Sequence, residues 1–329
     1  MIDSVRLSAE LFIPDAYFRW DVWRKHTYEN GKENYFVHQD KVWLRYYPDT
    51  YHLIIDGKLL TLLYDTDVLN VDDCYGNDLD AFLNDINDCL NQLFIQPVLD
   101  IRCFRATRVD YCFNVMTPYV TTYIDLLNRS FRMTNNGNRV NYVLEKRLSG
   151  SVYIKTKRDY QHNERRNYVL NYYDKSDWLF KQRKSNRVTH PMDEAFAKDV
   201  LRLEVQCGYQ FIKQICEKHG IPNRFDLLLS YEIALWAEET IYNRIFRNSS
   251  ELDFFTYEEA KKLLCSDSAK KALMASACGK KIVASDYDYG RRNICDAGIF
   301  PFAFLQKRGG VKTLVNPIKL LRDKIGLVA

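Results

Sequence analysis

The sequence predicts an α+β fold: an antiparallel sheet with flanking helices in residues 1–220, then a smaller helical domain in residues 221–329. Segments rich in β-branched and aromatic residues fill most of the first two thirds, and segments with helical spacing fill the last third. The length of 329 residues exceeds that of a typical single domain. With 47% hydrophobic and 27% charged residues, the composition is that of a globular chain.

The first strands are expected near the start of the chain. Met1–Leu7 roughly alternates apolar and polar residues, as a first strand does. Two longer strand-like segments follow, Phe36–Tyr47 and Tyr51–Leu63. A helix is expected over Leu79–Phe94, because its apolar residues recur at intervals of three and four, and the flanking Asn77-Asp78 offers caps.

The clearest strand is Ile101–Val115. Its alternating residues separate an apolar face from a polar face that carries Arg108, Asp110, Cys112 and Asn114. A helix over 121–131 follows it. A hairpin is then expected from Ser151–Lys155 and Tyr168–Tyr173, with a polar, charged connection.

The rest of the chain opens with a strand over Leu201–Cys207 and becomes helical. Helices are expected over Tyr209–His219, which ends at a glycine, and over Phe225–Phe246. Short basic helices then run to the end of the sequence, with breaks at Gly279, Gly290, Gly298 and Gly309–Gly310. Residues 251–329 carry a net charge of +5, which suits phosphate contacts or simply a solvated helical surface.

Composition and missing motifs exclude several classes of protein. No apolar stretch approaches the ~20 residues of a membrane span. The nine cysteines form no CxxC pair, so a zinc ribbon is not expected. The cysteines are instead expected to be reduced thiols in a cytoplasm. The sequence contains no GxxxxGK[ST], GxGxxG, GxSxG, HExxH or HUH motif. ATPases, Rossmann enzymes, α/β-hydrolases and zincins therefore lose most of their support.

Two strands repeat one pattern, an arginine and a carboxylate two residues apart. These are Arg108-Val109-Asp110 and Arg202-Leu203-Glu204. If the two strands are neighbours, both carboxylates and both arginines face one side of the sheet. Paired carboxylates suit Mg²⁺ or Mn²⁺, which can stabilise charge on a phosphodiester. The alternative is a pair of cross-strand salt bridges.

A third element is Tyr172-Tyr173-Asp174-Lys175. A tyrosine hydroxyl can attack a phosphodiester and remain bound to it, and a lysine two residues away can lower its pKa or neutralise a phosphate oxygen. The alternative is an ordinary strand tyrosine. His52 and Asp56 share one face of a strand-like stretch, where His52 is either a metal ligand or a hydrogen-bonded structural histidine.

Taken in order, several stretches resemble the rolling-circle replication initiators of phages and plasmids, of the filamentous-phage gene II/X type. They are Met1–Leu7 (MIDSVRL), Ala106–Asn114 (ATRVDYCFN), Asn167–Lys175 (NYVLNYYDK), Leu201–Val205 (LRLEV) and Ile294–Ile299 (ICDAGI). The Tyr-x-Lys step is also similar to that of the trans-acting plasmid Rep initiators. The motifs span nearly the whole chain, and their order and spacing carry the resemblance.

The resemblance implies a nicking domain related to the HUH endonucleases. Such a protein binds an origin, nicks one strand, holds the 5′ phosphate on a tyrosine and later rejoins the ends without ATP. The implied partners are single-stranded or hairpin origin DNA and a host helicase and polymerase, with no membrane, in the cytoplasm of a bacterial host. The helical domain is then a DNA-binding or accessory part.

The resemblance also assigns roles to residues. Tyr173 is the expected nucleophile, since Tyr-Asp-Lys matches the family's Tyr-x-Lys, and Tyr172 is the runner-up. Lys175 is expected to support the nucleophile or the scissile phosphate. Asp110 and Glu204 match the acidic strand positions and are the expected ligands of Mg²⁺ or Mn²⁺.

Arg108 and Arg202 are expected to contact phosphate or to orient these carboxylates. The family usually has an acidic residue in the segment that resembles Tyr51–Leu60, where this chain offers His52 and Asp56 as a third ligand. Two other functions remain open on the same residues. One is a non-catalytic origin-binding protein, and the other is a metal-dependent phosphodiesterase in which water attacks.

Overall fold

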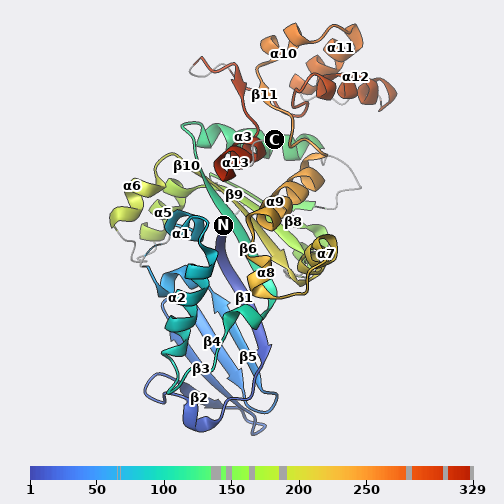
Figure 1. Ribbon diagram of the computed structural model, residues 1–329. Coiled ribbons are helices and arrows are strands. Elements are labelled where there is room, and N and C mark those ends of the chain that lie inside the picture. Colours follow the sequence, from blue (N-terminus) through green and yellow to red (C-terminus); the bar gives the residue numbers. More distant parts are fainter. Residues whose placement is uncertain are drawn as a thin grey trace.

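The molecule is a mixed α+β structure with a large antiparallel sheet, which confirms the predicted class (Figure 1). The computed structural model describes residues 1–64, 66, 68–134, 142–145, 150–162, 167–184, 191–278, 284–306 and 310–326. The predicted break at Gly279 lies outside these residues, as do Gly309 and the connection at residues 163–166 of the predicted hairpin.

The strands of the large sheet are β1 (Ile2–Glu10), β2 (Arg24–Thr27), β3 (Glu33–Gln39), β4 (Val42–Tyr47), β5 (His52–Gly57), β6 (Arg105–Met116), β7 (Tyr142–Leu144), β8 (Ser151–Thr156), β9 (Tyr168–Asp174) and β10 (Val200–Gly208). A small separate sheet pairs β11 (Phe254–Phe255) with β12 (Thr313–Leu314).

The α-helices are α1 (Val71–Tyr75), α2 (Leu79–Asn91), α3 (Val120–Thr134), α4 (Lys157–Gln161), α5 (Lys175–Lys184), α6 (Pro191–Ala197), α7 (Tyr209–His219), α8 (Phe225–Leu228), α9 (Tyr231–Phe246), α10 (Tyr257–Leu263), α11 (Asp267–Ala277), α12 (Ala284–Asp296) and α13 (Pro317–Ile325). Short 3₁₀ turns are η1 (Asp15–Tyr17), η2 (Leu59–Leu62) and η3 (Ile101–Cys103). Within the described residues no helix has the length and apolar character to cross a membrane.

In the part of the chain that the structure describes, ten strands form the large sheet in the order β2-β3-β4-β5-β1-β6-β10-β9-β8-β7. Each neighbouring pair in it is antiparallel. The strands β2–β5 lie at one end of the molecule, and α10–α12 lie at the other (Figure 1). The strands with the two arginine-carboxylate motifs, β6 and β10, are neighbours in the middle of the sheet.

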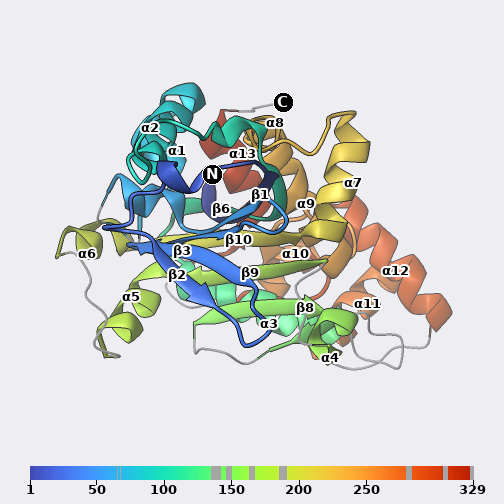
Figure 2. The same cartoon turned by 90° about the horizontal axis from the view of Figure 1, so that it is seen from below.

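The two faces of the sheet differ, as the alternation in the sequence predicts. Val109, Tyr111 and Phe113 of β6 are fully buried on one face, in the main hydrophobic cluster. Helix α2 buries its apolar stripe in this cluster. Of the two predicted cap residues, Asp78 is the N-cap, and it accepts a hydrogen bond from the Ala81 N–H at 3.0 Å. The helices α7 and α9 lie on the side of the molecule opposite α5 and α6 (Figure 2).

Two predicted strands are in fact interrupted. Phe36–Tyr47 is a hairpin of β3 and β4, because the chain turns at Asp40, which has a positive φ of 53°. The segment predicted as one strand from Ile101 starts with η3, and β6 begins only at Arg105. Asp100 caps η3 by accepting a hydrogen bond from the Arg102 N–H at 3.1 Å, which favours the turn over the strand.

Two predicted helical features also differ. The segment Phe225–Phe246 is divided into α8 and α9, because the chain is extended at Ser230, the N-cap of α9. Gly290 is inside α12 and does not break it. Its lack of a side chain permits a close approach of two helices, since a Cβ there would lie 2.5 Å from the Cβ of Ala272 in α11.

The described helices after residue 220 contribute to two hydrophobic clusters. Helices α8, α9 and α13 contribute Phe225, Ile241 and Ile318 to the cluster that also contains the sheet. Helices α10–α12 surround a second cluster, whose buried members are Ala260, Leu264, Ala269, Ala272, Leu273, Ile294, Ile299 and Phe304.

Candidate active site

The pairing of β6 with β10 brings the two predicted carboxylates to one face of the sheet. Asp110 lies opposite Gln206, and Glu204 lies opposite Cys112, so the carboxylates are diagonal neighbours on adjacent strands. Asp110 is 1% exposed and Glu204 is 4% exposed. The conditional prediction that these carboxylates share a face is therefore confirmed.

Arg108 and Ser4 hold the Asp110 carboxylate. The Arg108 guanidinium donates to both carboxylate oxygens, with 2.8 Å from Nε to Oδ1, and the Ser4 hydroxyl donates to Oδ2 at 2.5 Å. Burial raises the pKa of Asp110, and Arg108 lowers it by less, so the pKa stays above its ordinary value. Arg108 therefore holds this carboxylate in place, which is one of the two roles expected for it.

Tyr173 lies beside Glu204 on the same face. Its strand, β9, pairs with β10, and the Tyr173 hydroxyl donates a hydrogen bond to Glu204 Oε2 at 3.3 Å. Burial and then the Asp3 and Asp110 charges raise the pKa of Glu204, so this carboxylate accepts a proton more readily than an exposed one. Burial also raises the pKa of the Tyr173 hydroxyl, although Arg202 opposes the shift.

Tyr172 points to the opposite face, as the alternation of a strand requires. Its hydroxyl donates to Glu238 Oε2 of α9 at 3.0 Å in the helix-covered core. The structure therefore separates Tyr172 from Asp110 and Glu204 and places Tyr173 with them.

Arg202 is fully buried, and it does not form an ion pair with Glu204. Its guanidinium pairs with Asp3 of β1 at 2.9 Å, donates to the Val68 carbonyl at 3.3 Å and also donates to the Asn70 side chain. Arg202 thus fixes Asp3 and the segment before α1. In this arrangement it is not placed to contact a phosphate at the surface.

Asp3 is a charged neighbour that the sequence analysis missed. Burial raises its pKa, but Lys58, Arg202 and Lys175 together lower it further, so the pKa lies well below its ordinary value. The pairing of β1 with β6 is irregular between Ile2 and Ser4. Because of this bulge, simple alternation does not predict that Asp3 approaches the Arg202 face.

Lys175 lies at the start of α5 and is 1% exposed. Its ammonium group lies 5.6 Å from the ring centre of Tyr173 and 4.0 Å from that of Trp178, within cation–π range. Trp178 brings α5 over Tyr173, which is 6% exposed. The structure therefore brings Lys175 next to Tyr173, but the pKa of Tyr173 stays raised by burial, and Arg202 is the group that opposes this shift.

Gln206 is a second residue that the sequence analysis did not assign to the site. Its Nε2 donates to Glu204 Oε1 at 2.8 Å, while its Oε1 is buried and has no hydrogen-bond partner among the described residues. Two carboxylates and a free amide oxygen form an all-oxygen donor set of the kind that Mg²⁺ and Mn²⁺ prefer. These side chains therefore fit the expected divalent cation. No group of three or more His, Cys, Asp and Glu suited to a metal occurs among the described residues.

The two expected third ligands are elsewhere on β5. Asp56 pairs with Arg6 at 3.0 Å, and Arg6 is the cross-strand partner of Arg108. His52 lies at the other end of β5, opposite Glu10. The structure brings neither side chain to Glu204.

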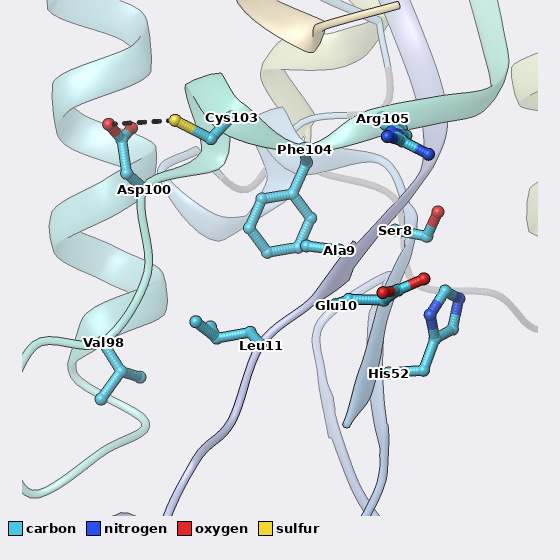
Figure 3. Close-up of a pocket in the computed structure, with 10 residues that line it drawn as sticks. All are labelled: Ser8, Ala9, Glu10, Leu11, His52, Val98, Asp100, Cys103, Phe104 and Arg105. Carbon is cyan, nitrogen blue, oxygen red and sulfur yellow. Dashed lines mark hydrogen bonds between the residues drawn. The ribbon is translucent and has the colours of Figure 1, made fainter. Parts of the chain in front are cut away.

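His52 lines a cavity of about 500 Å³ at the end of β1. Figure 3 shows Glu10 and His52 close together, with Ser8 and Arg105 above them. On the far side, the Cys103 thiol donates to Asp100 at 3.9 Å. This cavity is distinct from the Asp110–Glu204–Tyr173 group.

No protein-family model matches the chain, and no curated protein matches it.

Proposed function

We propose that this protein is a rolling-circle replication initiator that nicks and rejoins one strand of origin DNA through Tyr173. One observation carries the proposal: the Tyr173 hydroxyl donates to Glu204 at 3.3 Å, on the sheet face that also holds Asp110. The order of the sequence motifs supports the same conclusion. In this proposal the central strands correspond to an HUH-like nicking domain.

The proposed reaction is a phosphoryl transfer. The Tyr173 oxygen attacks the scissile phosphorus and the bond to the 3′ oxygen breaks, which leaves a 5′-phosphotyrosine and a free 3′ hydroxyl. Glu204 accepts the tyrosine proton, since its Oε2 already accepts that hydrogen bond. The departing 3′ oxygen takes up a proton, and the reverse attack rejoins the strand.

Asp110, Glu204 and Gln206 would hold Mg²⁺ or Mn²⁺. The bound cation would polarise the phosphodiester and offset the charge that develops on its oxygens. Arg108 keeps Asp110 in place, and Lys175 supplies positive charge beside Tyr173. In this proposal Arg202 has no direct part in the reaction and only stabilises the site.

The substrate must be a melted strand or a hairpin, because Tyr173 has to reach one phosphate. Since Tyr173 is 6% exposed, α5 must move away from β9 when DNA enters. The proposal includes a host helicase and polymerase as partners and the cytoplasm of a bacterial host as the location.

The test is covalent adduct formation. Purified protein is mixed with end-labelled single-stranded origin DNA and Mn²⁺, and we expect an SDS-resistant, protease-sensitive shift. Tyr173→Phe should lose the adduct, while the matched variant Tyr172→Phe, on the opposite face of the same strand, should keep it.

Two other outcomes would identify the alternative functions. Cleavage without an adduct, retained in Tyr173→Phe, would make water the nucleophile. Binding without cleavage would make the chain an origin-binding protein. Either result overturns the role of Tyr173.

A further inference from the structure

A large aromatic side chain lies exposed on the polar face of the sheet, on β4. On β4, Val42, Leu44 and Tyr46 point into the core, while Trp43 and Arg45 point to the other face. Trp43 is 46% exposed, although burying an indole is normally favourable.

The Trp43 ring is held in a fixed orientation. His38 of β3, its direct cross-strand partner, stacks on it with ring centres 4.1 Å apart and planes 28° apart. A cavity of about 270 Å³ adjoins Trp43 and is otherwise lined by Arg6, Arg45, Ile54 and Asp56. His38 covers one face of the Trp43 ring from the β3 side of β4. The strands β5 and β1 lie on the other side of β4, so the second ring face is toward the cavity.

The charge around this cavity includes an arginine without a counter-ion. Arg45 is exposed and has no carboxylate partner among the described residues; it donates only a long hydrogen bond of 3.5 Å to the Tyr47 hydroxyl. Arg6 is paired with Asp56, and its side chain is 54% exposed. An aromatic face beside exposed guanidinium groups is the combination that binds unpaired nucleotides.

This surface is continuous with the candidate active site. His38, Trp43, Asp56, Arg6 and Arg108 are cross-strand partners in one row over β3, β4, β5, β1 and β6. Neighbouring strands are ~4.8 Å apart, so Trp43 lies roughly 14 Å from Arg108 across the sheet. Arg108 in turn holds Asp110.

We propose that His38, Trp43 and Arg45 form a platform for single-stranded DNA, on which an unpaired base stacks against Trp43 while Arg45 contacts a phosphate. The proposal rests on the proposed function for the identity of the nucleic acid. It adds a second contact, outside the nicking site, that holds the melted strand as it crosses β5 and β1 toward Tyr173.

The test is equilibrium binding of a labelled single-stranded oligonucleotide, with EDTA present so that no strand is cut. Trp43→Ala should weaken binding by roughly 5- to 150-fold, the effect of losing one base stack. Trp43→Phe keeps a ring and should lose less. The matched control is Trp20→Ala. Trp20 is 47% exposed, but it packs against Phe18 and Tyr35 on the opposite face of the sheet. The affinity of this variant for the oligonucleotide should equal that of the wild type.

Arg45→Ala separates stacking from charge. It should reduce the slope of log affinity against log salt by about 0.7, the value of one phosphate contact on a single strand, whereas Trp43→Ala should leave the slope unchanged. Circular dichroism confirms that each variant is folded.

The outcomes distinguish this inference from the proposed function. If Trp43→Ala binds like the wild type, or if duplex of the same sequence binds as well as the single strand, the platform is refuted even when the Tyr173 adduct forms. If binding depends on Trp43 but no adduct forms, the platform stands and the nicking function fails. If the wild type binds no single strand, the platform is refuted.

Discussion

Glu238 is a buried carboxyl group that accepts a single hydrogen bond from the part of the chain that the structure describes. It is fully buried in α9, accepts from the Tyr172 hydroxyl, and its Oε1 has no partner among the described residues. Burial raises its pKa well above the ordinary 4.5, and the nearby Glu204 adds to the shift, while the Tyr172 hydrogen bond opposes it. The folded protein therefore holds the Glu238 proton more tightly than the unfolded chain.

This pKa shift predicts a pH dependence of stability. Above pH 4.5 the unfolded chain releases the proton and the folded protein keeps it, so the contribution of Glu238 to the free energy of unfolding falls as pH rises, until the folded-state pKa is passed. Glu238→Gln removes this titration. Urea unfolding between pH 5 and 9 should show the variant gaining stability over the wild type as pH rises, and a constant difference would contradict the prediction.

At the scale of residues, the alternation of side chains along a strand predicted that Tyr172 and Tyr173 lie on opposite faces of β9. It also predicted that Asp110 and Glu204 share a face. It did not predict Asp3, because the bulge in β1 changes the alternation. The alternation places Gln206 on the same face as Glu204. It does not predict that the Gln206 amide oxygen lacks a partner, because this depends on how the amide is held in the folded state. The partner of Arg202 is likewise a tertiary contact.

At the scale of elements, Gly57 controls how β5 fits between its neighbours. It lies opposite Val5 of β1 and Val42 of β4, with a φ of +146°. A Cβ there would lie 2.0 Å from the Lys41 carbonyl oxygen and 2.8 Å from the Val42 Cα. Both are backbone atoms, so the clash cannot be relieved by a rotamer change.

Gly57→Ala should therefore lower the free energy of unfolding by about 3 kcal/mol or more, from the clash and the unfavourable φ together. The control is Gly31→Ala, since Gly31 has a φ of +77° and no atom within 4 Å of the added Cβ. It should lose only about 1–2 kcal/mol. Denaturant unfolding of both variants tests this, and equal losses would show that the clash is relieved.

Hydrophobic alternation and helical spacing predicted most elements, because each pattern is local. The turn at Asp40 was missed because an aspartate can adopt the left-handed conformation without a glycine to signal it. The division between α8 and α9 was missed because both halves carry apolar residues on one face. Gly290 was misread since a helical glycine signals either a break or close packing.

At the scale of the whole molecule, the proposed cation site should affect global stability. Its ligands come from β6 and β10, which pair in the middle of the sheet, so binding favours the folded state. At a free Mn²⁺ concentration of 100 times the dissociation constant, the gain is about 2.7 kcal/mol. Thermal unfolding should show a higher Tm with Mn²⁺, and Glu204→Gln should abolish the shift.

Asp88→Asn is the matched control for this measurement, since Asp88 is an exposed carboxylate on α2, outside the site. It should retain the full Mn²⁺ effect. A Tm increase that persists in Glu204→Gln would mean that Mn²⁺ binds elsewhere.

The order of the strands could not be predicted from the sequence. Local patterns identify β1, β6, β9 and β10 as strands, but their adjacency is set by pairing between distant segments. The same limit applies to the helices after residue 220. Contacts with distant segments decide that α9 and α13 pack with the sheet while α10–α12 surround their own cluster.

The strand order affects how the chain folds while it is being synthesised. β6 ends at Met116, but its partner β10 begins only at Val200. At roughly 5–20 residues per second, a ribosome needs about 4–17 s to make the intervening chain. During this time the nascent β6 has one unpaired edge, which can pair with a neighbouring nascent chain. Productive folding is thus delayed until β10 has emerged, and a chain interrupted before Val200 should aggregate.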